Sequence, residues 1–155
     1  MNMAGAMLLP LPLMIISMGC AQPEFKAAQS VDGVLDLSEW VPEQHGMVSL
    51  SGSWAFYPRS FVPPQDLMHG RRDTSYFLDV PGTWNHLVLD REPVGGNLFG
   101  TYHLRLKMPR SPGIFALRVQ SALSAYDLWI DEELVASVGK PGTQESTTAA
   151  LYAPK

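Results

Sequence analysis

Cysteine is almost absent from this chain, because Cys20 is the only one among 155 residues. A single cysteine excludes an intrachain disulfide and the cysteine-rich zinc sites that hold many small exported domains together. The length is that of one domain, so the folded part must be stabilised by the packing of a single hydrophobic core.

Basic charge is also scarce. The chain has 11 Lys and Arg residues against 15 Asp and Glu residues, which gives a formal net charge of −4. A protein that binds a phosphate backbone needs an excess of basic residues, so nucleic acid is excluded as a partner. The 13 glycines and 13 prolines, with only 17% charged residues, predict many turns between short strands.

The motifs that carry chemistry are missing as well. No HxH or HExxH pattern is present, and there is no G-x-S-x-G, Walker A or G-x-G-x-x-G run. Neighbouring carboxylates such as Asp90 and Glu92 occur in turn-rich segments, where we expect them to be solvated. We therefore predict that the chain is not an enzyme and holds no metal or cofactor. The histidines are His45, His69, His86 and His103.

The first 23 residues contain no charged side chain, and they include the apolar run "AGAMLLPLPLMIISMGCA". Prolines interrupt this run, and the small residues around Cys20 offer a cleavage point, which predicts an export signal over residues 1–21 rather than a membrane span. "SMGC" approaches a bacterial lipoprotein box, although Ser17 and Met18 depart from it. Cleavage, lipidation of Cys20 and retention as an anchor stay open. A polar tether is expected over residues 22–33.

From Val34 onward, apolar and polar residues alternate in short runs, the pattern of half-buried strands. The runs are "GSWAFY" (52–57), "TYHLRLKM" (101–108), "GIFALRVQ" (113–120) and "AYDLWID" (125–131). The apolar faces that we expect to be buried are Trp54 and Phe56 in the first run, Tyr102, Leu104, Leu106 and Met108 in the second, Phe115, Leu117 and Val119 in the third, and Tyr126, Leu128 and Ile130 in the fourth. "PPQDLMHG" (63–70) predicts one short helical turn. Because turns separate the runs at regular intervals, we expect an all-β fold, an antiparallel β-sandwich of jelly-roll type over residues 34–155.

Four motifs stand in an order that resembles a known family: "VSLSGSWAFYP", "VPGTWN", "GTYHLRLKMP" and "LRVQSALSAYDLWIDEELVASVGKPGT". The order is similar to that of the N-terminal galactose-binding-like jelly roll of bacterial 7TMR-DISM signalling receptors. It is also similar to the non-catalytic sugar-binding domain of family 2 glycoside hydrolases. The resemblance spans about residues 34–148.

Two departures from the family pattern matter. Family members carry an Asn-Gly hairpin where this chain has Asp131, Glu132 and Glu133, which favours a longer or bulged connection. The tail "TTAALYAPK" stops where closing strands are expected, so we expect a domain truncated at its C-terminus with an exposed sheet edge.

The resemblance implies an extracytoplasmic sensing or ligand-binding module of a bacterial membrane signalling protein. It would be periplasmic or membrane-attached, would bind a small molecule or carbohydrate, and would act on the membrane helices and output domain of a parent receptor. Two alternatives remain open: the carbohydrate-binding domain of a glycoside hydrolase, and a protein–protein interaction domain.

Two tryptophans are the main candidates for a ligand site. "VPGT" predicts a type II turn with Pro81 and Gly82 at its centre. Trp84 then either plugs the end of the sandwich or offers a sugar platform, with Asn85 and Arg91 as hydrogen-bonding partners. Trp129 lies on the strand face opposite Leu128 and Ile130, so it either covers a loop, meets a neighbouring domain or contacts a ligand.

Overall fold

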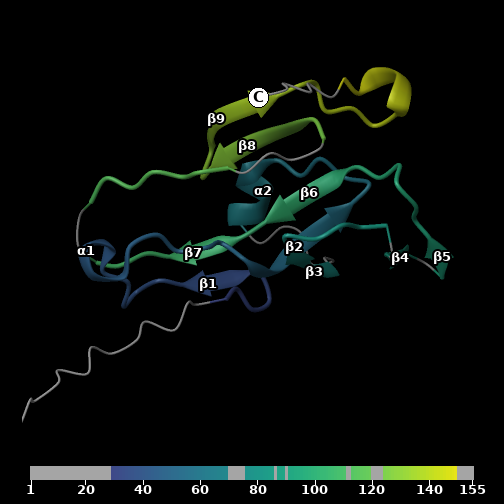
Figure 1. The fold of residues 1–155 in the computed structure, drawn as a ribbon. Coiled ribbons are helices and arrows are strands. Elements are labelled where there is room, and N and C mark those ends of the chain that lie inside the picture. Colours follow the sequence, from purple (N-terminus) through teal and green to yellow (C-terminus); the bar gives the residue numbers. More distant parts are fainter. Residues whose placement is uncertain are drawn as a thin grey trace, which may run out of the picture.

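The computed structural model describes residues 29–69, 76–85, 87–89, 91–110, 113–119 and 124–149, and this part of the chain is all-β (Figure 1). It contains nine strands, two short α-helices and one 3₁₀ helix. The expected all-β class is therefore confirmed. Within these ranges, no helix is long and apolar enough to cross a bilayer. The predicted signal over residues 1–21 and Cys20 lie outside them.

The elements follow one another along the chain as short pieces. They are β1 (Val34–Asp36), α1 (Pro42–His45), β2 (Gly52–Pro58), α2 (Pro64–Met68), β3 (Tyr76–Val80), β4 (Val88–Leu89), β5 (Glu92–Pro93), β6 (Gly100–His103), β7 (Arg105–Lys107), β8 (Tyr126–Ile130), β9 (Glu133–Val138) and η1 (Glu145–Thr147). Three strands form a sheet in the order β3-β2-β6, and the others form the pairs β1-β7, β4-β5 and β8-β9. Only the β1-β7 pair is parallel.

Strand β2 is the centre of the fold, and it buries residues on both of its faces. One face carries Ala55 and Tyr57, which pack with Val62 and with Leu67 of α2. The other face carries Phe56, whose side chain is completely buried. A strand covered on both sides needs apolar residues at consecutive positions, and Ala55–Tyr57 supplies them. The expected strand and the expected helical turn of α2 are both confirmed.

The run "TYHLRLKM" is predicted as one unbroken strand, but the structure divides it at Leu104 into β6 and β7. β6 pairs with β2, whereas β7 pairs with β1, and the backbone N–H of Arg105 donates to the carbonyl of Gly33 (2.8 Å). Because the run changes partner, its strict alternation is lost. Leu106 and Met108 are exposed instead of facing inward.

The run "GIFALRVQ" is not a strand in the part that the structure describes, residues 113–119. Phe115, Leu117 and Val119 are exposed rather than buried, although the ring of Phe115 lies 5.6 Å from that of Trp40. The alternating pattern is present, but no described strand exchanges backbone hydrogen bonds with this segment. The prediction of an inward-facing strand here is wrong.

The connection between β8 and β9 is shorter than expected. Ile130 pairs with Glu133, so the loop consists of Asp131 and Glu132 alone. A two-residue hairpin turn needs a positive φ at its first central residue. Asp131 has this left-handed backbone (φ 54), which aspartate tolerates better than most residues. A register shift does occur, but it lies within the strands, beside Leu128 and Trp129.

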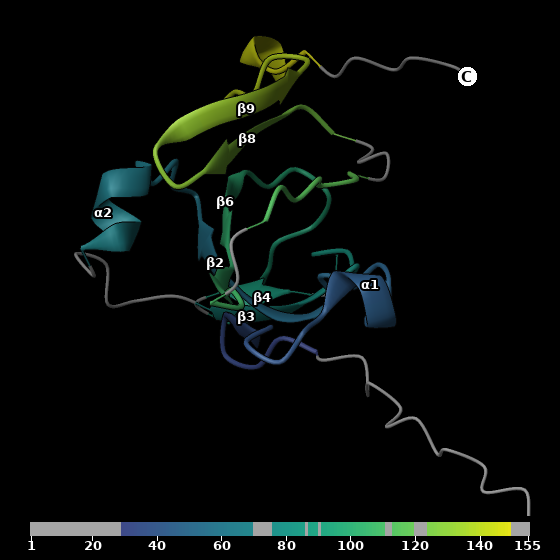
Figure 2. The ribbon, with the colours of Figure 1, turned by 90° about the vertical axis from the view of Figure 1, so that its left-hand side faces the viewer.

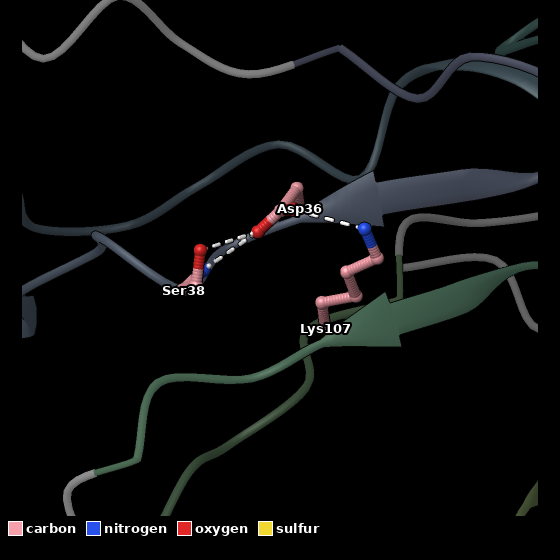
Figure 3. A network of polar contacts seen from close by, with 3 residues as sticks. All are labelled: Asp36, Ser38 and Lys107. Atoms are coloured by element: carbon pink, nitrogen blue, oxygen red, sulfur yellow. Dashed lines mark hydrogen bonds and ion pairs between the residues drawn. The ribbon is translucent and has the colours of Figure 1, made fainter.

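A small polar network fixes the β1-β7 pair (Figure 3). The Asp36 carboxylate accepts hydrogen bonds from the backbone N–H (3.0 Å) and hydroxyl (2.6 Å) of Ser38, and the Lys107 ammonium lies 3.2 Å from its second oxygen. These interactions favour the ionised form. The pKa of Asp36 is accordingly lowered from 3.8 to about 2, mainly by Ser38 and to a smaller extent by Lys107.

This network predicts an order of effects on the Asp36 carboxyl. In a carboxyl-detected NMR titration, Ser38→Ala is expected to raise the pKa of Asp36 more than Lys107→Met does. The stability that the network contributes should be fully present above pH 3.8 and be lost as the pH falls towards about 2, because the depressed pKa belongs to the folded state. A larger rise from Lys107→Met would show that the ion pair, not Ser38, is the main cause.

Candidate functional site

Trp84 lies against the aromatic face of the central sheet. Its ring centroid is 6.2 Å from that of Phe56 and 6.4 Å from that of Tyr102, and both pairs are stacked, with interplanar angles of 22° and 20°. The indole N–H donates to the carbonyl of Gly96 at 3.3 Å. Trp54 completes the group through an edge contact with Tyr102 at 6.5 Å. We call Trp54, Phe56, Trp84 and Tyr102 the aromatic cluster.

The aromatic cluster explains Trp84 without a ligand, because offset stacked rings are stabilising beyond the area that they bury. Stacking on Phe56 and Tyr102 is what we expect if Trp84 has a packing role in the fold. Sequence patterns miss the two rings beneath Trp84, since the register that sets Phe56 opposite Tyr102 joins strands far apart in the chain. The only available signal is that both residues occupy predicted inward positions.

The turn before Trp84 differs from the expected type II turn. That turn needs a positive φ at its third position, but Gly82 does not have one. The Val80–Pro81 peptide bond is cis. The predicted turn type is therefore wrong, although the chain does bend at Pro81.

Asn85 and Arg91, the two predicted hydrogen-bonding partners of Trp84, lie at different distances from it. Asn85 follows Trp84 directly and is exposed. Arg91 is also exposed and has a left-handed backbone (φ 71) in the turn between β4 and β5. Strands β4 and β5 form a two-stranded ribbon whose base lies next to Trp84. The backbone N–H of Leu87 donates to the Trp84 carbonyl, and the backbone N–H of Val94 donates to the Leu87 carbonyl. At roughly 3.3 Å per residue, Arg91 stands about 10 Å further along the ribbon than Leu87.

Trp129 does not belong to the same site. It lies on β8, is exposed, and pairs across the hairpin with Leu134. Figure 1 and Figure 2 place the β8-β9 hairpin and the β4-β5 ribbon on different sides of the molecule. The four predicted ligand-binding residues therefore divide into one group around Trp84 and Asn85, a second position at Arg91, and a separate surface at Trp129.

Burial shifts the pKa values of two titratable groups in the central sheet, Tyr102 of the aromatic cluster and its neighbour His103. Burial raises the pKa of the Tyr102 phenol, whose ring packs on Phe56 at 4.6 Å. Burial, and to a lesser extent the nearby Arg105, lowers the pKa of His103. Both shifts disfavour the charged forms of these side chains in the central sheet.

No group of three or more His, Cys, Asp and Glu side chains is arranged to hold a metal ion within the described ranges. Around Trp84 the structure places the half-buried indole itself, the exposed residue Asn85 and a glycine-containing loop at Gly95 and Gly96. These groups can stack on and hydrogen-bond to a neutral ligand. Comparison with protein-family models, curated proteins and solved structures finds no match to this chain.

Proposed function

We propose that this chain is an extracytoplasmic binding module of jelly-roll type that serves a bacterial membrane signal-transduction protein and acts by binding rather than by chemistry. The observation that supports it is the aromatic cluster with the exposed amide of Asn85 beside Trp84. Ligand sites typically combine an apolar or aromatic surface with a few polar groups that fix orientation. The apolar segment at residues 1–21 supports export of the module.

The mechanism of such a module is a shift between conformations. A ligand that prefers one conformation, or one arrangement relative to the membrane helices of the parent receptor, biases the output domain by its difference in affinity and by no more than that. The ligand class that fits stacked aromatic rings and an amide is a small neutral molecule or a carbohydrate.

The proposal predicts that Asn85→Ala weakens sugar binding and leaves the fold intact. We would titrate the full chain with galactose, glucose, xylose, N-acetylglucosamine and laminarin by calorimetry. One lost hydrogen bond should weaken the affinity by about tenfold. Asn85 is exposed, so the melting temperature should stay unchanged. Trp84→Phe, which retains the stack but loses the indole N–H, is the matched variant for the ring.

Two outcomes would contradict the ligand site. The site is absent if no sugar in the panel binds, or if Asn85→Ala and Trp84→Phe bind as tightly as the unaltered chain. A loss of the fold in Trp84→Phe with unchanged binding in Asn85→Ala would leave Trp84 with its structural role alone.

A carbohydrate-binding domain of a glycoside hydrolase would bind sugar through the same residues around Trp84. Sugar binding alone therefore does not distinguish this second candidate function from a receptor module. The DNA that follows the codon for Lys155 does. An adjoining frame with seven apolar helices supports the receptor, and a barrel with catalytic carboxylates supports the hydrolase.

A further inference from the structure

The β8-β9 hairpin forms the outermost layer of the molecule in both views, with β9 on the outside (Figure 2). Within the described residues, the buried apolar side chains all belong to the segment from Leu35 to Leu89. The hairpin follows this segment, and among the described strands β8 and β9 exchange ladder hydrogen bonds only with each other. Trp129 and Leu134 share one face of the hairpin because they pair, and both are exposed in the described structure.

A β-bulge gathers three large apolar residues on this hairpin. Leu128 pairs with Ala136 and Trp129 pairs with Leu134, so Val135 is the extra residue of the bulge. Two consecutive residues of β9 thus stand against the single residue Trp129. Trp129, Leu134 and Val135, which we call the apolar triad, are 45%, 47% and 45% exposed. A tryptophan flanked by aliphatic side chains is a common anchor of protein interfaces.

The charges around the apolar triad are separated along β9. Asp131, Glu132 and Glu133 stand at the start of the strand, and Lys140 follows just after its end. All four side chains are exposed, and none has an ion-pair partner among the described residues. An acidic start and a basic end are complementary to the same strand running in the opposite direction.

We propose that the partner of this surface is a second copy of the chain, packed hairpin against hairpin about a two-fold axis near the middle of β9. Each apolar triad then packs on the hairpin of the other copy, at the spacing of about 10 Å typical of stacked sheets. The axis sets Glu132 of each copy against Lys140 of the other. The acidic start and basic end of β9 favour a second copy over an unrelated partner. One two-fold operation sets opposite charges against each other and also brings the two apolar triads to the same interface.

Charge exchange tests the proposed register. Sedimentation velocity of the full chain over a range of concentrations should show a monomer–dimer equilibrium. Glu132→Lys and Lys140→Glu should each weaken it by about tenfold or more, since each sets like charges against one another. The double variant, which restores opposite charges across the axis, should recover the dimer. Glu145→Lys, an exposed reversal on η1, is the matched control and should leave the equilibrium unchanged.

A second variant tests the apolar triad. Trp129→Ser should weaken the dimer on the order of 30-fold, equivalent to a hot-spot loss of about 2 kcal/mol. Met47→Ser removes an exposed apolar side chain elsewhere and should have no effect. The proposal is overturned if the chain sediments as a monomer at every concentration, if Trp129→Ser dimerises as the unaltered chain does, or if the double charge exchange fails to restore what the single reversals remove.

Discussion

Phe56→Ala is expected to destabilise the fold by about 3–5 kcal/mol, a large part of the stability of a small domain. Phe56 has no exposed surface, and its ring contacts those of Tyr102 at 4.6 Å and Trp84 at 6.2 Å. Removing it opens a cavity between β2 and the aromatic rings above it, and the surrounding strands cannot collapse to fill that cavity. The loss is measured as the change in the free energy of unfolding in urea.

Phe77→Ala is the matched control for this prediction. Phe77 lies on the neighbouring strand β3 and pairs with Ala55, but its side chain is 48% exposed. Its removal should cost roughly 1 kcal/mol, because water already reaches the space that it leaves. Equal losses for the two variants would show that the aromatic cluster is not the centre of stability that the structure makes it.

Gly52→Ala should destabilise the fold by about 2–5 kcal/mol. Gly52 has φ 114, a conformation that residues with a Cβ rarely adopt, and an added Cβ would lie 2.6 Å and 2.7 Å from the backbone O and N of Ser30. The backbone strain contributes about 1–2 kcal/mol and the forced separation of the two segments about 1–3 kcal/mol. Ser30 also exchanges hydrogen bonds with Ser51 and Ser53, so the added Cβ disturbs that pairing too.

Gly96→Ala separates the effect of position from the effect of the substitution. Nothing lies within 4 Å of a Cβ at Gly96, and its φ is not positive. Its replacement should be neutral or slightly stabilising, since alanine reduces the conformational freedom of the unfolded chain. Thermal unfolding followed by circular dichroism measures both variants, and a comparable loss at Gly52 and Gly96 would refute the steric argument.

The sequence predicts the elements that depend on local pattern better than those that depend on a distant partner. β2, β8 and the short helix α2 follow from alternation and from consecutive prolines. Residues 113–119 have an equally clear alternation but lack a described backbone partner, and alternation alone cannot supply one. The break at Leu104 has the same origin, because a change of pairing partner leaves no mark in the hydrophobic pattern.

The site is predicted in a similarly uneven way. The importance of Trp84 follows from its place after a turn, but the stack on Phe56 and Tyr102 depends on the three-stranded sheet. Trp84 and Trp129 are both candidates from the sequence, and the structure places them on different elements. The sequence reveals which tryptophans are unusual and not which of them are neighbours. The bulge that gathers the apolar triad is also invisible in the sequence, because one residue shifts the register without a glycine to mark it.

The parallel pair of β1 and β7 has a consequence for how the chain is made. The ion pair that joins the strands links Asp36 and Lys107, which are 71 residues apart. At about 5–20 residues per second, β1 waits roughly 4–14 s on the ribosome before its partner has been synthesised. During that interval Leu35, which is fully buried in the folded protein, has no pairing partner for its strand. The parallel pair of β1 and β7 can therefore form only after most of the chain has been synthesised.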